Sequence, residues 1–142
     1  MAAVNSKRVL IGALAGWVAW VVWGGIINMV VLPASYEAAQ QQGSLLTEAR
    51  YGFFLPVYFL SLLGVSYILA WLYAGIRSTY GADAGTAVKL GVLAGFAIAF
   101  PLNFSTASWA PFSRVFPLWW MIELWVGAIL ATFIAAWLYK ED

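Results

Sequence analysis

The sequence predicts an all-α polytopic membrane protein, with four transmembrane helices in a single domain that covers residues 1–142. Composition gives the first reason: 64% of the residues are hydrophobic and only 9% are charged, whereas soluble domains have about 25% charged residues. Hydropathy gives the second, because apolar runs of about 20 residues recur along the chain, and this is the length that crosses a bilayer.

Length and flanking residues place the four spans. They are expected at about residues 9–32, 53–76, 86–104 and 118–139. Each can cross a hydrocarbon core of about 30 Å at about 1.5 Å per residue. The first run is longer than the roughly 7–15-residue core of a secretory signal peptide, so we expect it to stay in the protein as a helix.

The basic residues predict the orientation of the four spans. Two of the seven, Arg50 and Arg114, fall on one side of the predicted membrane, and the other five fall on the side of the termini: Lys7, Arg8, Arg77, Lys89 and Lys140. Cytoplasmic loops are enriched in lysine and arginine. We therefore expect both termini in the cytoplasm (N-in, C-in) and the protein in a bacterial cytoplasmic (inner) membrane.

The chain contains no cysteine and no histidine. Without them it lacks the ligands of iron–sulfur clusters, of thiolate zinc sites and of most haem, copper and zinc centres, and it lacks the commonest general base. The sequence thus predicts no catalytic residue, no metal site and no cofactor of its own.

Two pairs of short segments resemble each other. "IGALAGW" at residues 11–17 is similar to "LGVLAGF" at 90–96, and "ILAWLY" at 68–73 is similar to "IAAWLY" at 134–139. Each pair joins spans that enter the membrane from the same side, so the pattern predicts a parallel two-plus-two repeat of helical hairpins. Common packing needs within membrane helices are the alternative explanation.

Small residues and tryptophans mark helix-packing faces. They form small-x-x-x-small patterns and one aromatic stripe along the first span: Gly12, Gly16, Trp17, Trp20, Trp23, Gly91, Gly95 and Gly127. We expect Gly91 and Gly95 to seat the third span against the fourth within the chain. We expect Gly12 and Gly16, with the tryptophans, to face a second copy, another subunit or a flat lipophilic molecule.

Two polar side chains lie inside predicted spans, Asn28 in the first and Glu123 in the fourth. An intramembrane carboxylate costs a few kcal/mol and needs a partner or a function. The residues expected to share its end of the bundle form a candidate polar cluster: Asn28, Asn103, Ser105, Thr106, Arg114 and Glu123. A buried polar clamp and a titrating site for transport are the two interpretations.

The stretch "PLNFSTASWAPFSR", residues 101–114, interrupts the apolar pattern. Pro101 is expected to end or kink the third span because it lacks a backbone donor. Non-helical backbone at membrane depth needs cover by protein or water. We therefore expect a polar plug in which Asn103, Ser105, Thr106 and Ser108 bond the freed carbonyls.

The segment "YAGIRSTYGADAGTAVKLGVLAGF", together with four spans of this length and an N-in orientation, resembles an uncharacterised group of small bacterial four-helix integral membrane proteins, a domain of unknown function. The resemblance covers the whole length and implies a four-helix fold without known catalytic residues. The chain is also similar to the small multidrug transporters in having four helices and a membrane acid. Their essential glutamate lies in the first helix, and this first span has none.

These observations leave three functions. The favoured one is a non-catalytic integral membrane subunit or scaffold, which packs against partner subunits or lipophilic ligands (lipid, quinone or pigment) as a homo- or hetero-oligomer and binds no nucleic acid. The alternative is a small proton- or cation-coupled carrier that uses Glu123. A lipid-acting membrane enzyme is the third.

Overall fold

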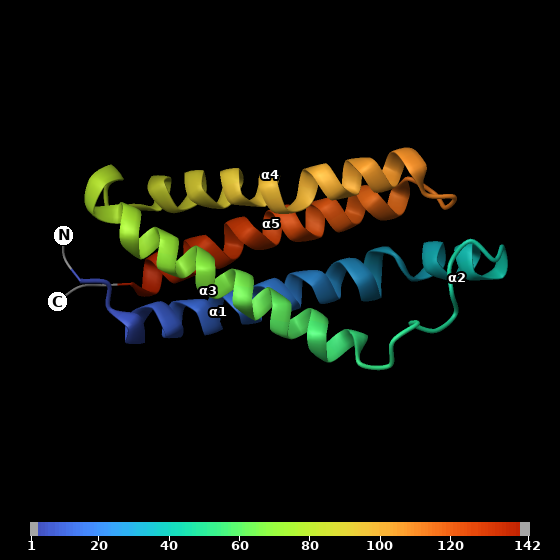
Figure 1. Ribbon diagram of the computed structural model, residues 1–142, viewed down its shortest axis with the longest axis horizontal. Helices are drawn as coiled ribbons and strands as arrows, with labels where there is room; N and C mark the ends of the chain where they lie inside the picture. The colour runs from blue at the N-terminus through green and yellow to red at the C-terminus, as the bar shows by residue number, and fades with distance from the viewer. Residues whose placement is uncertain (1–2, 140–142) are drawn as a thin grey trace.

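The computed structural model describes residues 3–139, and Lys140 lies outside this range (Figure 1). Four long helices and a short one make up the described chain, and a π-helical turn, η1, continues the first helix. Their bounds are α1 Ser6–Ile26, η1 Ile27–Val31, α2 Pro33–Gln41, α3 Phe54–Tyr80, α4 Ala84–Trp109 and α5 Val115–Leu138. The α1–η1 segment, α3, α4 and α5 are each long and apolar enough to cross a membrane. The predicted all-α membrane fold is confirmed.

Helix α5 is central, because α1, α3 and α4 all pack against it. The start of α1, the end of α5 and the α3–α4 turn lie at one end of the bundle, which we call the turn end, and α2 lies at the other, the α2 end (Figure 1). At the turn end the backbone N–H of Asn5 donates a hydrogen bond of 2.9 Å to the hydroxyl of Tyr139. This contact ties the beginning of α1 to the last turn of α5.

The contact between α1 and α5, which we call the α1–α5 seam, follows a four-residue register. Each step of four residues forward along α1 meets a step of four back along α5, as expected for antiparallel helices. The pairs in contact are Gly12 with Ala135, Gly16 with Ala131, Trp20 with Gly127 and Gly24 with Glu123. Every pair has a glycine on one of the two helices, so the two backbones can approach closely.

The seam changes the expected role of Gly12 and Gly16. A Cβ atom added at Gly12 would lie 3.0 Å from the Cα of Ala135, and one at Gly16 would lie 3.0 Å from the Cα of Ala131. The expectation that these glycines face an external partner is therefore wrong. They are buried inside the chain because α5 needs this close approach to reach α1.

The tryptophan stripe of α1 is also turned inward. Trp17 donates from Nε1 to the carbonyl of Phe59 on α3 at 2.9 Å. Trp20 is fully buried over Gly127, and Trp23 packs in the apolar cluster at the α2 end. The stripe packs between α1, α3 and α5, with Trp20 fully buried and Trp17 and Trp23 half-buried.

Gly91 and Gly95 seat α4 on α5, as expected. A Cβ atom at Gly91 would lie 2.7 Å from the Cα of Ile129, and one at Gly95 would meet the Trp125 side chain. A two-plus-two repeat would instead seat Gly91 on α3, as Gly12 sits on α5. The likeness of the two glycine segments is explained by packing, because both run antiparallel to α5 on different sides of it.

Helix α4 continues through Pro101 to Trp109, and only residues 110–114 connect it to α5. The predicted polar plug is therefore wrong, and the predicted end of this span at residue 104 is five residues too early. The polar side chains bond carbonyls four residues earlier in the same helix: Asn103 to Ala99, Thr106 to Leu102 and Ser108 to Phe104. A proline is tolerated in such a helix where side chains and local adjustments satisfy the backbone.

Candidate functional site

Glu123 lies in the α1–α5 seam with 3% of its surface exposed. Gly24 on α1 makes room for it, because a Cβ atom there would lie only 2.7 Å from Oε1 of Glu123. The carboxylate thus occupies a seam position opposite a glycine, where the other pairs place alanine or tryptophan. The free-energy cost of burying a carboxylate away from water has to be offset by hydrogen bonds.

Four side chains supply a connected set of hydrogen bonds, which we call the Glu123 network. Asn28 donates from Nδ2 to Oε2 of Glu123 at 2.9 Å, and the Tyr58 hydroxyl donates to Oε1 at 3.0 Å. The Tyr36 hydroxyl donates to Oδ1 of Asn28 at 2.6 Å. Trp120 donates from Nε1 to the Tyr36 hydroxyl oxygen at 2.9 Å. The network joins the α1–η1 segment, α2, α3 and α5.

Trp120 fixes the direction of this network. An indole N–H can only donate, so the Tyr36 oxygen accepts from it and the Tyr36 proton points to Asn28. The amide oxygen of Asn28 is then occupied as an acceptor, and its NH₂ group faces Glu123. Because Tyr58 also donates to it, Glu123 is the acceptor on which every branch ends.

The π-helical turn η1 places Asn28 in the network. In this turn the backbone N–H of Leu32 bonds the carbonyl of Ile27 five residues earlier, at 3.0 Å. Asn28 also donates from Nδ2 to the carbonyl of Gly24 at 2.9 Å, so its amide is held from two sides. Single π-helical turns inside α-helices are often found at functional sites.

Helix α2 covers the network at its end of the bundle. Tyr36 stacks on Phe116 of α5 with ring centroids 5.2 Å apart and planes 7° from parallel. Burial raises the pKa of the Tyr36 hydroxyl, while its hydrogen bond from Trp120 acts in the opposite direction. The phenol therefore stays protonated at neutral pH and remains a donor to Asn28.

Asn28 and Glu123 are the two predicted cluster residues that the structure brings together. The other four lie on α4 or just after it, and α4 packs on a different side of α5 from the α1–α5 seam. Asn103 is buried but bonds its own helix, Thr106 is half-buried, and Ser105 and Arg114 are exposed. Their expected contact with Glu123 is not formed.

Sequence reasoning missed Tyr36, Tyr58 and Trp120. Tyr58 lies one turn into α3, and Trp120 lies one turn before Glu123 on α5. Tyrosine and tryptophan at span ends are commonly interfacial anchors. A hydropathy pattern therefore does not indicate that their hydroxyl and N–H groups bond a buried acid. The available signal was the number of hydroxyl and indole donors near the depth of the acid.

The chemistry open to this site is narrow. Glu123 can accept hydrogen bonds or a proton, and its neighbours in the network are a neutral amide, two phenols and an indole. Within residues 3–139 no three acidic, histidine or cysteine side chains gather to hold a metal ion. Comparison of the chain with models of protein families, with characterised proteins and with solved structures found no match.

Proposed function

We propose that the protein is a non-catalytic subunit or scaffold of a membrane complex, and that the Glu123 network is its internal clamp. The observation that carries the proposal is that both oxygens of Glu123 accept hydrogen bonds from this chain's own side chains. The acid is buried, and the other members of its network include side chains from three other segments. It holds those segments together.

The face of α4 directed away from α5 is the surface proposed for a partner subunit or a flat lipophilic ligand such as a quinone or pigment. Leu93 is 70% exposed and Phe104 is 62% exposed, and together with Phe100 they form one stripe along the helix. Phe100 stacks on Phe104 with ring centroids 5.5 Å apart. This ring stack gives α4 a flat, stiff surface toward the bilayer.

The assembly state tests this proposal. The parent is expected to run in mild detergent as an assembly larger than one 15.5 kDa chain. A Leu93→Ala/Phe104→Ala variant should dissociate without loss of helix content, because both side chains are exposed on the isolated chain. Leu60→Ala, at an exposed position on α3, is the control and should keep the assembly. A parent that runs as a single chain would refute the subunit role, and an intact double variant would exclude this face.

A proton-coupled carrier is the second candidate function. The observation in its favour is that Asn28 and Tyr58, which donate hydrogen bonds to Glu123, are both neutral, so a proton bound there would discharge the acid without breaking an ion pair with either. Glu123→Gln separates the two functions. A glutamine can accept from Asn28 and donate to the Tyr58 oxygen, so the clamp and the assembly should persist, whereas proton-coupled uptake would be lost.

We further propose that both termini face the cytoplasm and that the membrane is the bacterial inner membrane. The turn end carries Lys7, Arg8, Arg77 and Lys89, which supports this orientation under the positive-inside rule. Single cysteines at Lys7 and at Glu48, in the otherwise cysteine-free chain, provide the measurement. In intact cells a membrane-impermeant thiol reagent should label only the cysteine at residue 48. Labelling of residue 7 alone would reverse the orientation.

A further inference from the structure

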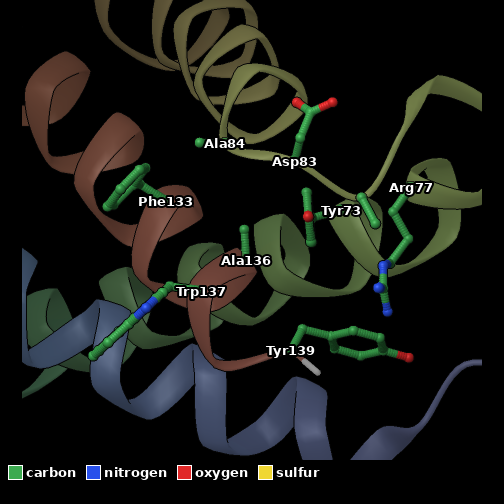
Figure 2. A pocket seen from close by; sticks show the side chains of 9 residues that line it. Tyr73, Arg77, Asp83, Ala84, Phe133, Ala136, Trp137 and Tyr139 are labelled. Atoms are coloured by element: carbon green, nitrogen blue, oxygen red, sulfur yellow. The ribbon is translucent and has the colours of Figure 1, made fainter. Parts of the chain in front are cut away.

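A cleft of about 440 Å³ opens at the turn end, between the end of α3, the start of α4 and the last turns of α5 (Figure 2). It forms because α3 and α4 both pack on α5 and contact each other little. Its volume falls within the roughly 300–1,000 Å³ of typical small-molecule sites. The Glu123 network lies at the opposite end of the bundle, so this cleft is a separate feature.

Tyr73 places a hydroxyl group in this cleft. The residue lies on α3, one turn before Arg77, and 2% of its surface is exposed. Among residues 3–139 the hydroxyl has no hydrogen-bond partner, although a buried tyrosine hydroxyl usually has one. In Figure 2 its oxygen lies in the middle of the cleft, between Ala136 and Arg77. The Tyr73 hydroxyl is therefore a donor available to a ligand.

The two charged side chains that line the cleft are already engaged within the chain. The guanidinium of Arg77 lies over the ring of Tyr139, with Cζ 4.8 Å from the ring centroid. Asp83 caps α4, where its Oδ1 accepts from the backbone N–H of Thr86 at 2.8 Å. The two side chains point away from each other (Figure 2). With one cation and one anion, each bound elsewhere, the cleft favours an uncharged ligand.

The α5 wall of the cleft is aromatic and opens toward the bilayer. Phe133 and Trp137 lie one turn apart on α5, and they are 44% and 66% exposed (Figure 2). Tryptophan is enriched where a bilayer meets water, so this wall lies near the membrane surface. Aromatic side chains pack favourably against other flat rings. A flat, lipophilic molecule can therefore enter the cleft from the bilayer.

From this geometry we infer that the cleft binds the ring of a membrane quinone. A ring carbonyl accepts a hydrogen bond from Tyr73, the ring packs against Phe133 and Trp137, and the apolar tail extends into the bilayer. A quinone is uncharged, flat and lipophilic, as the cleft requires. The ester carbonyl of a diacylglycerol can accept the same hydrogen bond, but it has no ring for the aromatic wall. This site is separate from the α4 surface, so it does not depend on the proposed assembly.

The test uses the purified full chain in mild detergent with decylubiquinone as the probe. Binding is measured by native mass spectrometry and by quenching of tryptophan fluorescence. We expect saturable binding that Tyr73→Phe weakens about three- to tenfold, the effect of one ordinary hydrogen bond. Didecanoylglycerol has carbonyl groups without a ring, and decylbenzene has a ring without carbonyl groups. Both should bind more weakly than the quinone.

The variants separate binding from stability. Tyr73→Phe removes a hydroxyl that has no partner among residues 3–139, so the free energy of unfolding without quinone should not change. Tyr67→Phe is the matched control, because this exposed tyrosine lies on α3 outside the cleft, and it should leave binding unchanged. Trp137→Leu keeps the wall apolar but removes the ring, so it should weaken the quinone.

Four results would each overturn the inference. They are a parent chain without saturable quinone binding, unchanged binding in Tyr73→Phe, unchanged binding in Trp137→Leu, and didecanoylglycerol that binds as tightly as decylubiquinone. The last result would assign the cleft to the glycerol esters of ordinary lipids instead.

Discussion

Replacing Asn28 by leucine is expected to lower the free energy of unfolding by about 2–4 kcal/mol, because it leaves a charged acceptor and a phenol donor unpaired inside the protein. Oε2 of Glu123 loses its donor from Asn28, and the Tyr36 hydroxyl loses its acceptor. Oε2 lies in the buried α1–α5 seam and the Tyr36 ring is stacked on Phe116, so neither group can replace its lost bond without a local rearrangement. Denaturant titration of the purified protein in mild detergent measures the change.

A second buried asparagine provides a matched control. Asn103 donates to the carbonyl of Ala99 in its own helix and has no bond to the Glu123 network. Asn103→Leu should therefore cost about 1 kcal/mol, the ordinary net value of a neutral hydrogen bond. Equal losses for the two variants would mean that the network adds nothing beyond one local bond.

A second substitution shows what causes the loss of stability in Asn28→Leu. If the loss of stability in Asn28→Leu comes from the unpaired carboxylate of Glu123, then adding Glu123→Leu in the same chain should restore most of the lost free energy of unfolding. The reason is that an apolar pair replaces an unpaired charge. The double-mutant cycle isolates this coupling. Additive losses would show that Asn28 and Glu123 act independently and would contradict the clamp.

Replacing Gly127 by alanine is expected to destabilise the protein by about 3 kcal/mol, an unusually large effect for one added methyl group. The new Cβ atom would overlap the indole of Trp20, with Cε2 only 2.6 Å away. Trp20 is fully buried between α1 and α5 and has no room to retreat. Separation of the α1–α5 seam should follow, seen as a lower midpoint in the same titration.

Gly25 is the control for this substitution, since a Cβ atom there would meet nothing within 4 Å. Gly25→Ala should stabilise the protein by about 0.5–1 kcal/mol, because alanine is the better helix former. Trp20→Phe combined with Gly127→Ala should recover part of the loss by removing the overlapping ring. A Gly127→Ala variant as stable as Gly25→Ala would show that the seam is looser than described.

The sequence also predicted that the small residues pack helices, but it could not assign their partners. The segments around Gly12 and Gly91 have the same spacing, and nothing local distinguishes a face used inside the chain from one left for another subunit. The structure uses both on α5, on different sides of it. Only the placement of all the helices decides which faces stay exposed, and the side of α4 turned away from α5 is one of them.

By itself the sequence determined the class of the protein: four helices long and apolar enough to cross a membrane, and an acid that needs internal partners. These follow from the length of apolar runs and from the cost of a charge in hydrocarbon, which are local properties. Tertiary structure alone decided the partners of Glu123. Asn28 was within reach of prediction. Tyr58 reaches the acid only because α3 crosses α1, and Tyr36 reaches Asn28 only because α2 folds over α5, so residues far apart in the chain form one network around the carboxylate.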